Sequence, residues 1–277
     1  MKKDPTISAM LNLYYNRHDF NSKCNWVMDS LKQGWPDSIA MRHNEVYYGQ
    51  PSAYWGFINN NWHLILKHID NGVDWWFWDM PFWGRWSRHN DEEHYWHAAK
   101  NNVYPTVVKP YPNDRFNKSY KPYRKGEYIL VCPSSDTMTR WITGKTEDEW
   151  IQETVDEIKQ HTDRPIKIRR KPRVKGMSGP DAEVITGVGP VEMDLENAHC
   201  VVTTVSLVAF TAQLEGVPTF CDPKSFAAEV SETDLSKIET PKHADREPWF
   251  AWLGYNQFTE REIRSGFAYE ILTDMYR

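Results

Sequence analysis

The chain has 277 residues, of which 40% are hydrophobic and 26% are charged, and its formal net charge is −5. These proportions are typical of a globular protein, and the length suggests roughly two domains of about 150 residues each. No apolar run reaches the roughly 18 residues that a membrane-spanning helix needs, and no secretory segment opens the sequence. We therefore expect a soluble, cytoplasmic protein without a membrane partner.

The two halves of the chain differ in charge and in aromatic content. Residues 1–125 hold ten of the 14 tryptophans and 16 Lys and Arg against 12 Asp and Glu, a net charge of +4. Residues 126–277 hold 17 Lys and Arg against 26 Asp and Glu, a net charge of −9. The first half is therefore a candidate surface for a polyanion. An uneven distribution of charged residues over the surface, without a binding role, explains the same numbers equally well.

The cysteines and histidines show no spacing typical of a metal site. Cys132 and Cys200 lie in apolar runs, so we expect them in the core as small hydrophobic residues. His94 and His97 have no carboxylate or Cys partner at metal-ligand spacing, and we expect them on the surface or in a loop. The sequence thus predicts no metal ligand.

In the first half, short apolar runs alternate with helical patterns. The alternation favours an α/β domain. Strands are predicted over residues 11–15, 38–41, 54–58 and 75–78, and helices over residues 22–33 and 62–69. The last strand, Trp75-Trp-Phe-Trp78, ends at Asp79.

Residues 80–89 form an irregular aromatic and basic loop after Asp79. Aromatic rings can stack on a base or a sugar, and arginines can hold phosphates. The candidate acceptor contacts are Trp83, Arg85, Trp86 and Arg88. The alternative is that the loop tryptophans, like those of the preceding strand, fill the core.

Residues 101–125 are rich in Pro, Asn, Tyr and Lys, and we expect a linker or an exposed flap there. Its basic residues are Arg115, Lys118, Lys121, Arg124 and Lys125.

A second α/β unit is predicted from Glu127 onward. Tyr128–Cys132 is a buried strand, and Ser134 and Ser135 form the turn after it. The other predicted elements are an amphipathic helix over residues 147–160, a strand over 165–172 that runs into a basic loop, and a helical turn over 194–197.

The stretch from Cys200 to Phe220 reads as strand, polar turn, helix, Gly-Pro stop and strand. Thr203, Thr204 and Ser206 occupy the turn. Such a βαβ unit offers an anion site at the carboxyl end of its strands, which suits a nucleotide diphosphate. N-capping of the helix explains the hydroxyl residues as well. Near the end of the chain, residues 249–272 are predicted to be helical, and Thr259 with Glu262 predicts a capping box.

Four stretches of the sequence carry a resemblance to a known family. They are Trp75-Trp-Phe-Trp-Asp79 with Phe82 and Gly84, Arg170-Lys171-Pro172, Leu214-Glu-Gly-Val-Pro218, and the tail from Trp249 through Trp252-Leu-Gly-Tyr-Asn-Gln-Phe-Thr-Glu-Arg-Glu-Ile-Arg-Ser-Gly266. They resemble the small glycosyltransferase-like proteins encoded by tailed phages and prophages. The resemblance covers most of residues 75–85 and 127–270, and it is weak in residues 1–70.

The resemblance implies a GT-B fold, in which two Rossmann-like domains face a cleft and the last helix returns to the first domain. The expected ranges are 1–125 for the acceptor domain, 126–245 for the nucleotide-sugar domain and 246–277 for the returning tail. The family carries amides where this chain has Val205 and Leu207, whereas the hydroxyl of Ser206 is kept.

The resemblance also implies roles for individual residues in the donor domain. Glu215 is expected to accept hydrogen bonds from the donor ribose; the alternative is a solvated glutamate before a helix stop. Arg170 and Lys171 are expected to neutralise the diphosphate as the glycosidic bond breaks, without a metal. A solvated basic surface is the alternative. The full set of expected donor contacts is Ser134, Ser135, Arg170, Lys171, Thr203, Thr204, Ser206 and Glu215.

Asp79 is the candidate general base, because transfer to a hydroxyl group needs a proton acceptor within hydrogen-bond reach. The alternative is an aspartate that caps the following turn. An inverting enzyme needs such a base, whereas a retaining GT-B enzyme can work without one.

The predicted function is transfer of a sugar from a nucleotide diphosphate sugar, with UDP favoured, to a hydroxymethylated pyrimidine in phage DNA. The expected partners are the nucleotide sugar and double-stranded DNA, no cofactor or metal is expected, and a phage-encoded enzyme would act in the host cytoplasm. The alternatives are transfer to a capsular or lipopolysaccharide glycan, and a non-catalytic, Trp-rich protein that binds carbohydrate or DNA.

Overall fold

The computed structural model describes residues 10–15, 23–41, 46–58, 60–85, 94–171, 183–186 and 189–277. The chain divides into two compact units. The first unit comprises the chain up to Phe116 together with Phe250–Arg277, and the second is Asn117–Trp249. The C-terminal segment therefore belongs to the first unit, as the predicted fold class requires.

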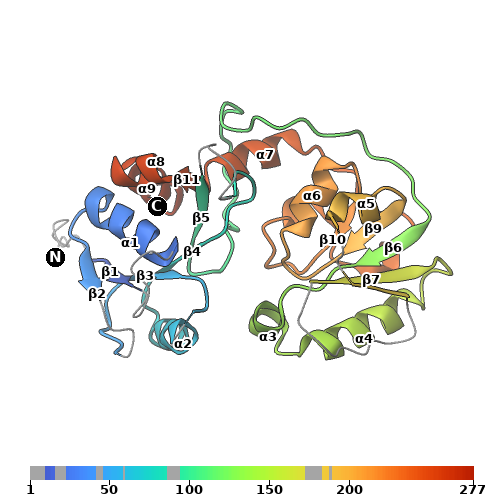
Figure 1. The fold of residues 1–277 in the computed structure, drawn as a ribbon, viewed down its shortest axis with the longest axis horizontal. Helices are drawn as coiled ribbons and strands as arrows, with labels where there is room; N and C mark the ends of the chain where they lie inside the picture. The colour runs from blue at the N-terminus through green and yellow to red at the C-terminus, as the bar shows by residue number, and fades with distance from the viewer. Residues whose placement is uncertain are drawn as a thin grey trace, which may run out of the picture. The chain divides into compact units, whose positions relative to one another are not determined.

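The first unit is built on a mixed sheet whose strand order is β11-β5-β4-β3-β1-β2 (Figure 1). Strands β1 to β4 are parallel, β5 is antiparallel to β4, and β11 is antiparallel to β5. The strands span Asn12–Tyr14 (β1), Ile39–Met41 (β2), Ser52–Trp55 (β3), Trp75–Asp79 (β4), Tyr95–Lys100 (β5) and Gln257–Thr259 (β11).

Helices cover both faces of this sheet, as alternating side chains along its strands require. One face packs against α1 (Lys23–Gly34), α8 (Glu260–Arg264) and α9 (Phe267–Met275) through a shared apolar cluster. The other face meets α2 (Asn61–Asn71), where the Tyr54 hydroxyl lies 2.9 Å from Nε2 of His68.

Close backbone approach explains how the C-terminal segment docks on α1. A Cβ atom on Gly34 would lie 1.7 Å from the carbonyl oxygen of Ile263, so only glycine fits at the end of α1. The sequence-distant helices α1 and α8 therefore lie side by side in the first unit (Figure 1).

The second unit is built on a parallel sheet whose strand order is β10-β9-β6-β7-β8. The strands span Tyr128–Val131 (β6), Ile166–Arg170 (β7), Glu183–Thr186 (β8), Ala198–Val202 (β9) and Thr219–Phe220 (β10). Its helices are α3 (Asp136–Thr143), α4 (Glu147–Ile158), α5 (Val191–Leu195) and α6 (Val208–Leu214), with short 3₁₀ turns at Ala228–Val230 and Leu235–Lys237.

This second sheet is also covered on both faces. Ile151 and Val155 of α4 pack on one face with Val131 of β6. Leu195 of α5 and Ala212 of α6 pack on the opposite face. The central strands β6 and β9 are accordingly buried throughout, as in other doubly wound parallel sheets. The helix α7 (Glu247–Gly254) carries the chain from the second unit to the first.

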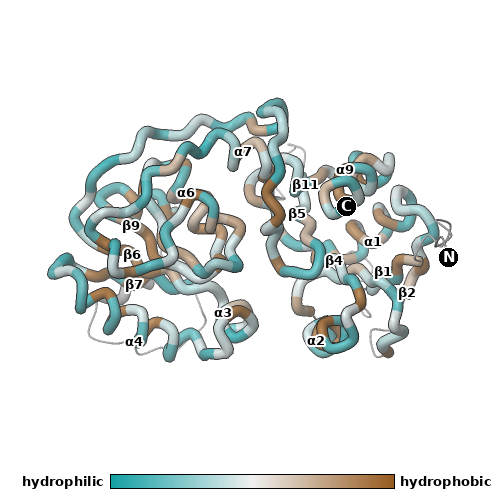
Figure 2. The backbone as a smooth tube through the Cα atoms, turned by 180° about the vertical axis from the view of Figure 1, so that it is seen from behind, coloured by the Kyte–Doolittle hydropathy of each residue, from teal (hydrophilic) through white to brown (hydrophobic). Residues whose placement is uncertain are grey.

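The predicted fold class is confirmed: the protein is α/β, with two Rossmann-like sheets and a C-terminal segment that returns to the first unit. Cys132 and Cys200 are buried as expected. The stretch between β5 and β6 is irregular and mainly hydrophilic, as Figure 2 shows. In the described part of the chain, no helix combines the length and the apolar character needed to span a membrane.

Two expectations about local structure were wrong. The region 249–272 is not continuously helical, because β11 interrupts it and pairs with β5. His97, expected on the surface or in a loop, lies within β5 and is 1% exposed. In both places long-range strand pairing overrides the local pattern, since β5 and β11 are far apart in the sequence.

Candidate functional site

The carboxyl ends of β6 and β9 lie side by side in the second unit. Val131 of β6 is in register with Val202 of β9, and the chain leaves β6 toward β7 on its other side. The strand order therefore reverses between these two strands. In open α/β sheets, ligands bind at this position, beyond the carboxyl ends of the strands.

Two hydroxyl side chains that follow these strands meet there. Thr204 Oγ1 donates a hydrogen bond of 2.6 Å to Ser134 Oγ, and the backbone N–H of Val205 donates to the same oxygen at 3.3 Å. A serine oxygen that accepts two hydrogen bonds still carries its own proton. Ser134 is thus left with a donor at the reversal point, and we call this contact the Ser134–Thr204 pair.

The neighbouring hydroxyls serve the local fold. Ser135 is the N-cap of α3 and accepts a hydrogen bond from the N–H of Met138. Ser206 accepts one from the N–H of Val208 at the start of α6. Ser135 thus caps its helix, whereas Ser206 precedes Leu207, the N-cap of α6, which has no side-chain cap. Thr203 is buried, and its hydroxyl has no hydrogen-bond partner among the described residues.

Arg170 ends β7 and is enclosed by carboxylates. Its Nη1 lies 3.4 Å from Glu147 Oε1 and 2.5 Å from Asp148 Oδ1, and its side chain is 5% exposed. Its Nε and Nη2 have no hydrogen-bond partner within the described part of the chain. Two carboxylates thus neutralise the guanidinium, although two of its nitrogens keep donor capacity. Lys171 is exposed.

Glu215 lies away from the Ser134–Thr204 pair. It caps the C-terminus of α6, which leads from the carboxyl edge of the sheet back toward the start of β10. With seven residues, α6 separates its two ends by about 10 Å. The Glu215 carboxylate instead forms an ion pair with Lys121.

In the first unit, Asp79 ends β4 and is half-buried. Its Oδ1 accepts a 2.7 Å hydrogen bond from the N–H of Met80. Its Oδ2 faces the turn after β3, since a Cβ atom on Gly56 would lie 3.8 Å from it. One carboxylate oxygen therefore holds the turn, and the other has no hydrogen-bond partner among the described residues.

His97, the register partner of Asp79, fixes the same turn from β5. Its Nδ1 lies 2.5 Å from the carbonyl oxygen of Met80, and its Nε2 lies 3.1 Å from that of Val103. The ring stacks on Tyr104 at 5.0 Å. Burial, reinforced by the negative charge of Asp79, raises the pKa of the Tyr104 hydroxyl above its usual range. Sequence reasoning missed this histidine, because only the strand pairing places it beside Asp79.

The structure places the aromatic loop residues differently from one another. Trp83 is 7% exposed and packs edge-on against Phe116, with ring centroids 5.4 Å apart. Arg85 is exposed. Trp86 and Arg88 lie outside the described residues.

Three basic residues of the expected flap make internal contacts. Arg115 pairs with Glu262, and Lys121 pairs with Glu215. Arg124 donates to the carbonyl oxygens of Leu195, Glu196 and Glu215. Lys118 and Lys125 are exposed. The flap therefore offers a polyanion less charge than its composition indicates.

Within the described residues, no group of three or more His, Cys, Asp or Glu side chains is arranged to hold a metal ion.

No protein-family model and no curated protein matches this chain. Among solved structures, the chain is similar to two transferase chains of Thermosulfurimonas dismutans KpsC. The β-Kdo 2,4 transferase is 11% identical, with 88% of this chain and 90% of that chain covered and a TM-score of 0.47. The β-Kdo 2,7 transferase is 13% identical, with coverages of 95% and 99% and a TM-score of 0.48.

The chain is also similar to the spinosyn rhamnosyltransferase SpnG. That likeness has 12% identity, covers 97% of this chain and 69% of that chain, and has a TM-score of 0.30. At such identities and scores, none of these structures assigns a role to a residue of this chain.

Proposed function

We propose that the protein is a glycosyltransferase that takes a sugar from a nucleotide diphosphate sugar, with UDP as the favoured nucleotide. The observation that carries the proposal is the Ser134–Thr204 pair at the reversal of strand order between β6 and β9. A doubly wound sheet binds nucleotides at that position. In this chain the strand-end hydroxyls converge there.

Hydrogen bonding supports a phosphate at this edge. The remaining proton of Ser134 can be donated to a phosphate oxygen, and hydrogen bonds to ionised acceptors are stronger than neutral ones. The Arg170 guanidinium is buried and neutralised by Glu147 and Asp148, whereas Lys171 carries an exposed charge at the end of the neighbouring strand. We assign Lys171 to the departing diphosphate.

Asp79 is proposed as the general base in the first unit. In the transfer step, an acceptor hydroxyl oxygen attacks the anomeric carbon, and the bond from that carbon to the phosphate oxygen breaks. The electron pair leaves with the nucleoside diphosphate, and the hydroxyl proton passes to Oδ2 of Asp79, which has no hydrogen-bond partner among the described residues. His97 positions this carboxylate by holding the turn after β4.

For the acceptor, the internal contacts of Arg115, Lys121 and Arg124 favour a glycan hydroxyl over duplex DNA. A DNA-binding surface gains its affinity from cations that are free to contact phosphates. The hydroxymethylated pyrimidine in DNA, which the family resemblance suggests, is the second candidate. It is supported by the net charge of +4 in residues 1–125.

One experiment tests both the glycosyltransferase activity and the identity of the acceptor. The protein is incubated with a panel of nucleotide sugars and with either oligosaccharides or DNA that carries hydroxymethylcytosine or hydroxymethyluracil. Mass spectrometry of the products then shows which acceptor gains a sugar. A sugar on DNA alone would reverse the preference for a glycan, and the absence of turnover together with the absence of nucleotide binding would overturn the glycosyltransferase assignment.

A further inference from the structure

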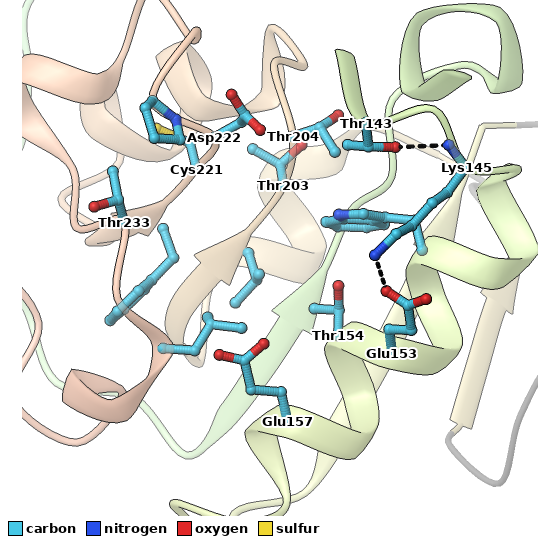
Figure 3. Close-up of a pocket in the computed structure, with 15 residues that line it drawn as sticks. Thr143, Lys145, Glu153, Thr154, Glu157, Thr203, Thr204, Cys221, Asp222 and Thr233 are labelled. Atoms are coloured by element: carbon cyan, nitrogen blue, oxygen red, sulfur yellow. Dashed lines mark hydrogen bonds and ion pairs between the residues drawn. The ribbon is translucent and has the colours of Figure 1, made fainter. Parts of the chain in front are cut away.

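A pocket of about 360 Å³ opens in the second unit at the carboxyl ends of β9 and β10. Its walls come from these strand ends, from the loop between α3 and α4, and from one face of α4. Figure 3 shows how the labelled side chains lie around it. The lining residues used below are Lys145, Trp150, Glu153, Glu157, Thr203, Thr204 and Asp222.

The lining of this pocket carries an excess of negative charge. Lys145 and Glu153 form an ion pair and neutralise each other. Among the described residues, the carboxylates of Glu157 and Asp222 have no cationic partner, and Asp222 uses only Oδ1, which accepts from the N–H of Lys224 at 2.8 Å. Two uncompensated carboxylates disfavour a phosphate or a uronic acid, and they favour hydroxyl donors or a cation.

Polar and aromatic groups complete the lining. Trp150 is half-buried in the wall, and an indole ring offers a flat apolar surface as well as a favourable face for a cation. Thr203 is 2% exposed, and its Oγ1 has no partner among the described residues. A buried hydroxyl without a partner is unfavourable, and a ligand or a water that reaches it removes this cost.

We propose that this pocket binds a hydroxyl-rich ring of monosaccharide size without negative charge, and that it prefers a ring with a cationic amine. The carboxylates accept from the ring hydroxyls and attract the amine, while Trp150 packs against the apolar face of the ring. Because Thr204 both lines the pocket and donates to Ser134, the pocket adjoins the proposed diphosphate position. Binding of a sugar to this pocket can be measured without a nucleotide, so it does not depend on the proposed transfer reaction.

Ligand-observed NMR titrations with glucosamine, glucose, glucuronate and glucose 6-phosphate test the site on the full chain. We expect the affinity to fall from glucosamine to glucose, with no detectable binding of the two anionic sugars. Asp222→Asn should weaken glucosamine binding about tenfold and glucose binding much less, because a contact to a charged group is lost. Trp150→Leu should weaken the binding of both sugars.

One control and two further pocket variants keep the test decisive. Thr240→Val, a substitution at an exposed threonine outside the pocket lining, should leave both sugar affinities unchanged, whereas Thr203→Val should lower them. Glu157→Gln removes the charge of an exposed carboxylate on α4 without disturbing the core, so it should weaken glucosamine binding more than glucose binding. Anionic sugars that bind as well as glucosamine, or pocket variants that behave like Thr240→Val, would overturn the proposal. Nucleoside diphosphate binding is titrated separately, so a failed sugar site and a failed donor site are told apart.

Discussion

Arg115 and Glu262, 147 residues apart in the sequence, form a two-pronged ion pair in which Nη2 of Arg115 donates to Oε2 of Glu262 at 2.9 Å. The guanidinium also donates to the carbonyl oxygens of Gly254 and Gln257, at 2.7 and 3.0 Å. The same Glu262 oxygen accepts the N–H of Thr259 at 2.9 Å and so closes the capping box of α8. One carboxylate thus caps a helix and ties the C-terminal segment to Arg115.

Arg115→Ala should destabilise the protein by about 3 kcal/mol, because it leaves the partly buried Glu262 carboxylate and two carbonyl oxygens without their donor. Chemical denaturation followed by circular dichroism measures the loss. The matched control is Arg261→Ala, since Arg261 is exposed on α8. Equal stability of the two variants would show that the Arg115 contacts contribute little.

The same pair should make stability depend on pH. Burial opposes ionisation of Glu262, but the hydrogen bonds from Arg115 and Thr259 and the charge of Arg115 outweigh it and hold the pKa of this carboxyl below its usual range. Because the pKa is lower in the folded state, the stabilisation is present above the unfolded pKa of about 4.3 and is lost as the pH falls through the folded value.

The free energy of unfolding should therefore fall more for the unsubstituted protein than for Glu262→Gln between about pH 6 and about pH 3. Glu270→Gln, at an exposed position on α9, should retain the full pH dependence. Parallel pH profiles for all three proteins would contradict the linkage.

A buried polar network should stabilise α6 against β10. Gln213 is fully buried, its Nε2 donates to Thr219 Oγ1 at 2.7 Å, and its Oε1 accepts from the Tyr123 hydroxyl at 2.8 Å. Gln213→Leu should cost about 2–3 kcal/mol, because it removes hydrogen bonds to the buried Thr219 hydroxyl and to the partly buried Tyr123 hydroxyl. Gln152→Leu on the exposed face of α4 serves as the control in the same denaturation experiment. A loss no greater than that of the control would refute the role of the network.

Glu215 and Ser134 should differ in their effect on nucleotide binding. Glu215→Ala should change the affinity for a nucleoside diphosphate by less than about twofold, whereas Ser134→Ala should weaken it about tenfold through loss of a hydrogen bond to a charged oxygen. The reason is position: Glu215 ends α6 and pairs with Lys121, away from the reversal point. Isothermal titration calorimetry with UDP measures both affinities. Equal weakening by the two substitutions would restore the ribose role for Glu215.

The contrast between these two residues shows what the sequence could and could not predict. The strand, turn and helix pattern placed Ser134 and Thr204 at strand ends, and parallel pairing then brought them together. The ribose role of Glu215, by contrast, was implied only by the family resemblance, and the structure places this residue at the far end of α6, paired with Lys121. The capping box of Thr259 and Glu262 is local in sequence and was confirmed.

Contacts between distant segments escaped prediction for a physical reason. The cations of residues 115–125 looked exposed because composition records charge but not partners. Arg115 pairs with the carboxylate of Glu262 in the C-terminal segment, and Lys121 pairs with that of Glu215, the residue before Gly216. A Cβ atom on Gly216 would lie 2.1 Å from the carbonyl oxygen of Pro122. A glycine at this position therefore allows the backbone around Pro122 to approach closely.

Asp79→Asn tests the proposed base. The asparagine oxygen can still accept the N–H of Met80, so the turn after β4 should persist while the proton acceptor is lost. We expect the turnover rate to fall by about 10²- to 10⁴-fold with little change in nucleotide affinity, since Asp79 lies in the first unit and the Ser134–Thr204 pair in the second. Initial rates and equilibrium titrations on the same preparation separate the two effects. Asp70→Asn, at an exposed position on α2, should leave both unchanged. An undiminished rate for Asp79→Asn would mean that the acceptor proton leaves by another route, as in a retaining transfer.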